Sequence, residues 1–238
     1  MKNSSDEIYI NGDYFRNNPG WAIEDAPWKA DIIFKLLQKN KIDCRKIIEV
    51  GCGAGGILEQ LCFKSSDFTE LLGYDISPQA ISLARARENN RLKFKNEDFL
   101  QRSQETCDLL LVIDVLEHVD NFYQFLRAVR TQSKNFIFHV PLDLSCRTIL
   151  KPHVMLQQRE AVGHIHYFSK EMVLWFLQDT GYKVVDWVYT KPVVDTRPSD
   201  SFKREVKKIL RNFSFSLRKD LSAKLWGGYS MMILAKQV

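Results

Sequence analysis

The chain has 238 residues, 45% of them hydrophobic and 26% charged, an ordinary globular composition that excludes a disordered or collagen-like chain. Its length favours one elaborated domain, and it contains no run of about 18 apolar residues that could cross a bilayer. The net charge of +5 is uneven: residues 197–238 carry ten basic and three acidic side chains, a balance of +7 that leaves −2 for the rest. A uniformly basic nucleic-acid binder would show another pattern.

The first residues lack the apolar core of a secretory signal peptide. The five cysteines are odd in number and show no Cys-x-x-Cys spacing, which argues against a disulfide framework or a zinc module. We therefore expect a cytoplasmic protein with reduced thiols.

The first 45 residues are expected to form helices that cap the rest of the chain. Asp25 can cap, and Pro27 can open, a helix with apolar residues at helical spacing. This helix either packs on a sheet with its tryptophans in the core or closes as a lid over a ligand, and we favour the lid. The side chains available to close it are Tyr14, Arg16, Trp21 and Trp28.

Residues 46–196 predict the core, in which strands and helices alternate. Apolar runs indicate strands at 46–50, 71–74, 92–95, 109–113, 136–140 and 182–189. Ser77 and Pro78 suit the cap and first position of one helix between them. The strand at 109–113 is apolar throughout, as expected of a central parallel strand. The β-α-β-α order predicts an α/β doubly wound sheet, mostly parallel, with helices on both faces.

The end of the chain departs from this order. A last strand within 226–238 follows a long excursion instead of a compact crossover helix, which favours an antiparallel last strand. Residues 197–225 read as a basic amphipathic insertion. We favour a solvated helix that covers the substrate end of the sheet; the alternatives are peripheral contact of 202–213 with an anionic membrane, and binding of an anionic small molecule or RNA backbone. The apolar stripe of this helix consists of Phe202, Val206, Ile209, Leu210 and Phe213.

A glycine-rich turn after the first strand of the core indicates a ligand site. The run from Glu49 to Gly56 reads Glu-Val-Gly-Cys-Gly-Ala-Gly-Gly, and its glycines let the backbone approach a ligand closely. Asp75 ends the next strand 20 residues past Gly55, where a carboxylate can accept hydrogen bonds from both hydroxyls of a ribose. The spacing also fits the dinucleotide fingerprint. Glu49, however, would repel a pyrophosphate and suits a cationic group such as a sulfonium or an ammonium.

Two further motifs follow strand ends, namely Glu97-Asp98-Phe99 and Asp114-Val115-Leu116-Glu117-His118-Val119. Together with the glycine turn they resemble the class I S-adenosylmethionine-dependent methyltransferases of the small-molecule type, over residues 47–140. The run at 163–169, Gly-His-Ile-His-Tyr-Phe-Ser, is similar to the segment before the last helix in many such proteins. The resemblance implies a Rossmann-like sheet of seven strands with an antiparallel last strand, and S-adenosylmethionine as the cofactor.

The resemblance also implies which residues hold the cofactor. Glu49 and the glycines would line its methionine part, and Asp75 its ribose. Asp98 and Phe99 would contact its adenine. The full set is Glu49, Gly51, Cys52, Gly53, Gly55, Asp75, Ile76, Asp98, Phe99, Asp114 and Val115.

Methyl transfer is an in-line displacement, so the protein mainly has to hold the acceptor in line and exclude water. A general base helps when the acceptor is a hydroxyl. His118 is the catalytic candidate; the alternative is a helix-start residue bonded to the backbone. His139, inside a strand, is interpreted as a satisfied core residue. The candidate substrate contacts are Trp28, Glu117, His164 and His166.

His164 and His166 alternate, so both would face the same side of an extended segment. We favour a structural role for them over substrate contact. No third ligand is evident at a suitable spacing, so we predict no metal site.

The favoured function is O-methylation of a small-molecule hydroxyl. The Asn-Pro-Pro-Tyr type of motif that marks amino-group methylation in the family is absent, and no RNA-binding module is apparent, so a nucleic-acid substrate is not expected. Three alternatives stay open: an RNA or protein methyltransferase that grips its substrate with the basic helix, an NAD-binding oxidoreductase, and a non-catalytic cofactor-binding protein. The sequence does not predict the oligomeric state.

Overall fold

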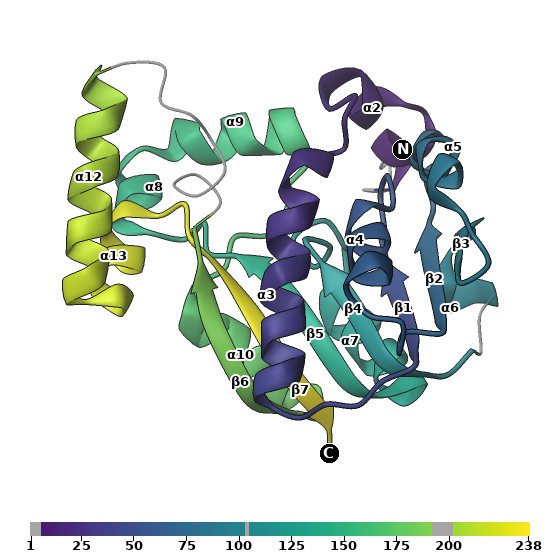
Figure 1. The fold of residues 1–238 in the computed structure, drawn as a ribbon. Coiled ribbons are helices and arrows are strands. Elements are labelled where there is room, and N and C mark those ends of the chain that lie inside the picture. Colours follow the sequence, from purple (N-terminus) through teal and green to yellow (C-terminus); the bar gives the residue numbers. More distant parts are fainter. Residues whose placement is uncertain (1–5, 103–104, 192–201) are drawn as a thin grey trace.

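The computed structural model describes residues 6–102, 105–191 and 202–238 (Figure 1). In this part of the chain, seven strands form one sheet in the order β3-β2-β1-β4-β5-β7-β6. The strands are β1 (Lys46–Val50), β2 (Glu70–Asp75), β3 (Leu92–Asn96), β4 (Cys107–Ile113), β5 (Ser133–Pro141), β6 (Tyr182–Thr190) and β7 (Ser230–Gln237). Strands β1 to β5 are parallel, and β7 is antiparallel to both β5 and β6. The predicted mostly parallel sheet with an antiparallel last strand is confirmed.

Helices cover both faces of the sheet, as predicted (Figure 1). They are α1 (Glu7–Ile10), α2 (Asp13–Asn17), α3 (Ala26–Lys39), α4 (Gly56–Lys64), α5 (Pro78–Ala84), α6 (Phe99–Arg102), α7 (Phe122–Val129), α8 (Cys146–Leu150), α9 (Pro152–Val162), α10 (Lys170–Asp179), α12 (Phe202–Leu217) and α13 (Lys219–Trp226). In β4, Leu109 and Leu111 pack in the layer of α3, α4 and α5, whereas Leu110 and Val112 pack in the layer of α7 and α10. Because side chains alternate along a strand, covering both faces requires a strand that is apolar throughout.

The predicted helix starts are mostly capped by their own side chains. Ser77 accepts a hydrogen bond from the Ala80 amide at 3.3 Å, and Pro78 occupies the first turn of α5. Helix α3 begins at the residue after Asp25, but the prediction that the Asp25 side chain caps it is wrong. A 3₁₀ turn at Ile23–Asp25 leads directly into α3, so the Asp25 backbone is already helical and its side chain makes no capping hydrogen bond.

A layer of short helices lies across the carboxyl ends of the strands. It combines α1 and α2 from the N-terminus with α8 and α9, which lie between β5 and α10 (Figure 1). The two parts meet where the Asn18 side-chain amide donates to the Ala161 carbonyl at 3.0 Å. Helix α9 was not predicted, because its apolar residues do not form a clear stripe at helical spacing; none of its residues is fully buried.

The basic helix α12 contacts the body of the protein through Arg211 and through Phe215, whose ring stacks on the Tyr229 ring at 5.0 Å. Arg211 is buried, donates to the carbonyls of Gly227 and Gly228, and lies 5.1 Å from the centre of the Tyr229 ring. The apolar stripe instead faces solvent, with Phe213 64% exposed. The side chain of Phe202, which we placed in this stripe, lies outside the described side chains. None of the described helices has the length and apolar character needed to cross a bilayer.

Candidate active site

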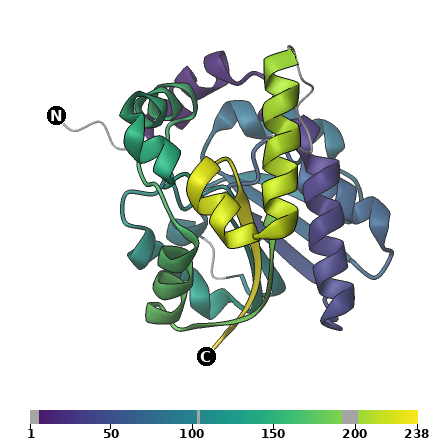
Figure 2. The same ribbon diagram turned by 90° about the vertical axis from the view of Figure 1, so that its left-hand side faces the viewer.

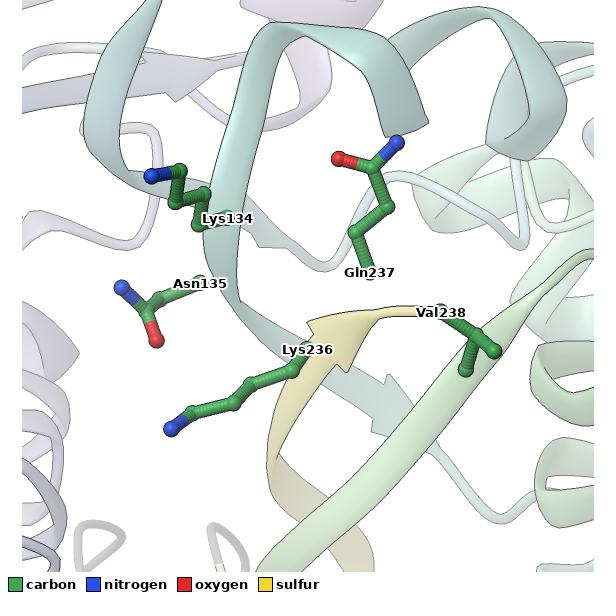
Figure 3. A pocket seen from close by; sticks show the side chains of 5 residues that line it. All are labelled: Lys134, Asn135, Lys236, Gln237 and Val238. Carbon is green, nitrogen blue, oxygen red and sulfur yellow. The ribbon is translucent and has the colours of Figure 1, made fainter.

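A cavity of about 740 Å³ lies at the carboxyl ends of β1, β2 and β4, and residues of α1, α2 and α9 enclose it. A second hollow of about 480 Å³ lies at the opposite end of the sheet, where β5 begins and β7 ends (Figure 3). Two lysines, two side-chain amides and Val238 line that second hollow. Ligands of open α/β sheets bind outside the carboxyl ends of the strands. The first cavity is therefore the candidate active site.

The glycine turn forms one wall of this cavity. Gly53 and Gly55 have φ angles of +53° and +79°, in the left-handed region that favours glycine. A Cβ atom on Gly53 would contact the Trp21 ring at 3.4 Å, so Trp21 lies directly over the turn. A Cβ atom on Gly55 would lie 2.4 Å from Phe94 Cζ, which leaves no room for a side chain. Gly55 thus serves packing beneath the turn and does not line the cavity.

Asp75 ties the turn to the end of β2. Its Oδ2 accepts from the Gly53 amide at 2.9 Å, and its Oδ1 accepts from the Ser77 amide at 2.8 Å. Burial raises the pKa of Asp75 to about 6, and the two amide donors oppose this shift. Each carboxylate oxygen retains a second lone pair. The side chain lines the cavity and can accept from a diol there.

Glu49 lies at the floor of the cavity with 1% of its surface exposed, and its Oε2 has no hydrogen-bond partner. Burial raises its pKa to about 8, while the Lys29 ammonium acts in the opposite direction. Without a ligand this carboxyl group is therefore mostly protonated at neutral pH. The repulsion of a pyrophosphate that we expected from the sequence is correspondingly weak. A cationic ligand would favour the ionised carboxylate.

A buried polar network that the sequence did not reveal lies beside Glu49. Lys29 Nζ donates to Asp114 Oδ2 at 2.6 Å, and His139 Nδ1 lies 2.6 Å from Asp114 Oδ1. Burial raises the pKa of Asp114, but His139 and Lys29 outweigh it and hold that pKa well below its usual range. His139 Nε2 contacts the Thr190 hydroxyl at 2.8 Å, which confirms His139 as a satisfied core residue. Lys29 could have been noticed as a lysine on the buried side of α3.

Aromatic residues of the N-terminal segment, which we predicted to form a lid, line the cavity. The Tyr14 ring lies 4.9 Å from the Tyr9 ring and 4.6 Å from the Trp21 ring, centre to centre. All three side chains line the cavity. Of the other lid candidates, Arg16 is exposed and pairs with Asp13. Trp28 lies outside the lining, with its ring edge-on to His139 at 6.4 Å.

At the far end of the cavity, the motif after β4 meets the segment after α9. The amides of Ile165 and His166 both donate to the Glu117 carbonyl, at 2.9 and 3.1 Å. The backbone therefore turns here, and the expectation that His164 and His166 face the same side is wrong. His164 lines the cavity, whereas His166 Nε2 contacts the Val119 carbonyl at 2.9 Å and lies outside the lining.

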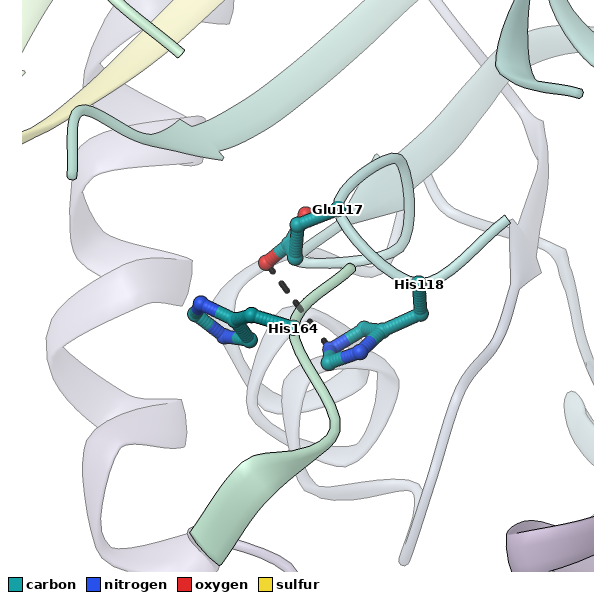
Figure 4. A group of neighbouring side chains, drawn as sticks. All are labelled: Glu117, His118 and His164. Carbon is teal, nitrogen blue, oxygen red and sulfur yellow. Dashed lines mark ion pairs between the residues drawn. The ribbon is translucent and has the colours of Figure 1, made fainter. Parts of the chain in front are cut away.

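Glu117, His118 and His164 converge in this corner (Figure 4). His118 Nδ1 lies 3.2 Å from the Gly163 carbonyl, and burial lowers the pKa of His118 to about 4. Burial also raises the pKa of Glu117 well above its usual value, and the nearby Asp114 adds to this. The His118 ring is thus neutral, and its Nδ1 proton is held by the backbone. Burial disfavours the protonated ring, but the lone pair on Nε2 and the buried carboxyl group are suited to bind a cation.

Ten of the eleven residues predicted to hold the cofactor line the cavity, all except Gly55, as do the substrate candidates Glu117 and His164 and the catalytic candidate His118. Side-chain atoms that are buried without a hydrogen-bond partner also belong to its lining. They are the Tyr9 hydroxyl, Trp21 Nε1, Glu49 Oε2, both carboxylate oxygens of Glu117 and Gln158 Oε1. An unpaired buried polar group costs about 1–3 kcal/mol. This lining therefore fits a ligand that carries several polar and cationic groups.

Comparison with known proteins agrees with this geometry. The chain is 26% identical over 129 residues to a ubiquinone biosynthesis O-methyltransferase of Histophilus somni (strain 2336), and the match spans 50% of this chain and 46% of that protein. Two solved structures share the fold. A magnesium protoporphyrin IX methyltransferase from Synechocystis PCC 6803, with bound S-adenosylhomocysteine, has a TM-score of 0.64 at 15% identity and 98% coverage of both chains.

An N-methyltransferase from Bradyrhizobium japonicum WM9, also in complex with S-adenosylhomocysteine, has a TM-score of 0.59 at 18% identity. That match covers 94% of this chain and 96% of the other. A family model described as a methyltransferase domain matches residues 23–186, which include the glycine turn, Asp75 and the motif after β4. This match spans well over half of the chain, and the protein belongs to the methyltransferase-domain family.

Proposed function

We propose that this protein transfers a methyl group from S-adenosylmethionine to a hydroxyl group of a small molecule. Three features of the cavity support the cofactor. Asp75 can accept from the ribose hydroxyls, Glu49 and Asp114 suit the positive charges of the methionine part, and Asp98 with Phe99 lies at the end of β3 for the adenine. S-adenosylmethionine supplies a methyl group on a sulfonium, whose loss of charge drives the transfer.

The corner that holds Glu117, His118 and His164 supports a hydroxyl acceptor. A hydroxyl must lose its proton when its oxygen is methylated. A group beside the hydroxyl therefore has to accept that proton or stabilise the oxyanion. The observation that carries this assignment is the Glu117 carboxyl group, which is 1% exposed, has no partner on either oxygen, and lies 4.0 Å from His118 Nε2. The O-methyltransferase from Histophilus somni is consistent with this acceptor class.

Matched acceptors test the proposal. The protein is incubated with methyl-tritiated S-adenosylmethionine and with pairs of phenols and anilines that differ only in the acceptor group. We expect label in the phenols and none in the anilines. His118→Gln should lower the rate by about 100-fold or more, whereas His153→Gln, an exposed control on α9, should leave it unchanged. Label in the anilines alone, or an equal effect of the two substitutions, would contradict the proposal.

We also propose that the enzyme meets an anionic membrane with one apolar face, formed by α8, α9, α12 and α13. Figure 2 shows these helices gathered on one side of the molecule. Among the described residues, eleven of the eighteen exposed large hydrophobic side chains lie on these four helices. They are Ile149, Leu150, Leu156, Val206, Ile209, Leu210, Phe213, Leu217, Leu221, Leu225 and Trp226.

Charge favours an anionic bilayer as the partner of this face. Exposed basic side chains lie on or directly between the same helices, among them Arg147, Lys151, Arg218 and Lys219. Apolar side chains interspersed with lysine and arginine are typical of helices that lie in the membrane interface. Residues of α9, and the segment just after α13, also line the cavity, so an acceptor held in the bilayer would be close to the active site.

Co-sedimentation with vesicles tests this contact. We expect binding to phosphatidylcholine vesicles that contain phosphatidylserine, and little binding to phosphatidylcholine alone. The double variant Phe213→Ser, Leu217→Ser should lose most of this binding. The control Phe63→Ser removes a side chain that is 73% exposed on α4 and should bind as the wild type does. A wild type that stays in the supernatant, or an equal loss in the control, would refute the membrane contact.

A further inference from the structure

Three metal-ligating side chains from two distant segments meet inside the cavity. Glu117 and His118 follow β4, and His164 follows α9 (Figure 4). One potential ligand atom from each residue lies within 4.8 Å of the others. The amides of Ile165 and His166 fix this meeting, because both donate to the Glu117 carbonyl. The three residues therefore form one cluster, which the fold holds in place.

Both imidazoles are oriented by a second partner. The Gly163 carbonyl, 3.2 Å from His118 Nδ1, can only accept, so Nδ1 carries the proton and Nε2 offers a lone pair. His164 Nδ1 lies 2.9 Å from Asp143 Oδ2 in the same way, which leaves its Nε2 open. The Gln158 side-chain amide holds the other oxygen of Asp143, at 2.9 Å. A histidine held by a carboxylate or a carbonyl through one nitrogen is the usual arrangement of metal-binding histidines.

The third group, Glu117, has no hydrogen-bond partner, and the dashed line in Figure 4 marks its ion-pair contact with His118. Glu117 is 1% exposed, and neither carboxylate oxygen makes a hydrogen bond. Burying a carboxylate without a compensating group is strongly unfavourable. Its nearest basic atom in the cluster, His118 Nε2, lies 4.0 Å away, beyond hydrogen-bond distance. A positive group placed between Glu117 and the two imidazoles would compensate the ionised carboxylate.

We propose that Glu117, His118 and His164 bind a divalent first-row transition metal ion, such as Co²⁺, Mn²⁺ or Zn²⁺. Two imidazole ligands favour this class over Mg²⁺ or Ca²⁺, which prefer all-oxygen sites. Ligand atoms at about 2.1 Å from one ion lie roughly 3–4 Å apart. A shift of about 1 Å in the unrestrained Glu117 carboxylate and the adjacent rings would bring the three atoms to this spacing.

This assignment rests on the proposed function and deepens it. All three ligands line the cavity, so the remaining coordination positions face the space available to the acceptor. A hydroxyl oxygen bound there would lose its proton to solvent more readily, because the ion stabilises the resulting oxyanion. That oxygen then forms the bond to the methyl carbon as the carbon–sulfur bond breaks. The ion thus performs the task for which the sequence offered His118 as a general base.

Direct metal binding tests the site independently of any acceptor. The full chain is freed of metal with a chelator, saturated with S-adenosylhomocysteine, and titrated with CoCl₂ by calorimetry and visible absorption. We expect one Co²⁺ per chain, with absorption bands that report imidazole ligation, and weaker binding of MgCl₂. Glu117→Gln and His164→Gln should each weaken Co²⁺ binding by at least about 100-fold. Asp143→Asn should weaken it by about 10- to 100-fold.

Two controls keep the outcome decisive. His153→Gln removes an exposed histidine on α9 and should leave the Co²⁺ affinity unchanged. Calorimetry with S-adenosylhomocysteine shows whether each variant is folded. Absence of stoichiometric Co²⁺ binding, or binding that His153→Gln removes and His164→Gln does not, would overturn the metal site. If Co²⁺ binds as expected but only anilines are methylated, the metal site stands and the hydroxyl assignment fails.

Discussion

The substitution Asp75→Asn tests how the cavity holds its cofactor. In the wild type, both carboxylate oxygens accept from backbone amides, Gly53 at 2.9 Å and Ser77 at 2.8 Å, and the residue lines the cavity. Asparagine has nearly the same shape, but it carries one acceptor oxygen and no charge. Its NH₂ group must then face either one of these amides or the ribose.

The loss can be estimated from the bonds at risk. A hydrogen bond to a charged group contributes about 1.5–3 kcal/mol, and we expect Asp75→Asn to remove about one such bond to the ligand. The affinity for S-adenosylhomocysteine should therefore fall by about 10- to 150-fold. Isothermal calorimetry at pH 7.5 measures this, with Asp67→Asn, an exposed aspartate before β2, as the control.

The pH dependence supplies a second readout of the same substitution. Because burial raises the pKa of Asp75 to about 6, its charge is lost as the pH falls through 6. The affinity difference between wild type and Asp75→Asn should shrink below pH 6 and be full above about pH 7. A raised folded pKa contributes stability at low pH that is lost as the pH rises through 6, so the substitution relieves a burial cost at pH 7.5 but also removes one of the two amide hydrogen bonds. Thermal melting at pH 7.5 shows that the variant used for calorimetry is folded. Equal affinities in folded variants at pH 7.5 would refute the ribose assignment.

Three further predictions concern the polar network and the turn. Lys29→Met removes the cation 2.6 Å from Asp114 and should lower the free energy of unfolding by about 1.5–3 kcal/mol, measured by urea denaturation; unchanged stability would contradict the network. Gly55→Ala should lower it by about 2–4 kcal/mol, because φ is +79° and Phe94 fills the space, whereas Gly20→Ala should not; equal effects would show that the turn is not constrained. Trp21→Ala uncovers Gly53 and should weaken S-adenosylhomocysteine by about 10-fold in calorimetry; an unchanged affinity would exclude Trp21 from the closed lid.

The fold was largely predictable because its signals are local. Near-continuous apolar runs indicated the central strands, and β4 could be recognised as central because a strand covered on both faces needs apolar residues throughout. The glycine turn was equally visible, since glycines after a strand and an aspartate at the end of the next strand recur at short sequence distances. Its placement beside Asp75 follows from the pairing of β1 with β2.

The contacts that the sequence did not reveal join distant segments. Lys29 meets Asp114 across 85 residues, and nothing in the spacing around either residue indicates the other. The backbone turns after His164 because the amides of Ile165 and His166 donate to the Glu117 carbonyl. We had assumed an extended segment there, which would place both histidines on one side. Which side of α12 faces the protein could not be predicted from the local sequence pattern either. The buried Arg211 holds the helix with its apolar stripe toward solvent.

Equilibrium titration of the wild-type protein with S-adenosylhomocysteine and, in parallel, with NADH tests the central claim most directly. We predict that one S-adenosylhomocysteine binds per chain and that NADH neither binds nor displaces it. Saturable binding of NADH in its place, or a folded protein that binds neither compound, would contradict the assignment of this cavity.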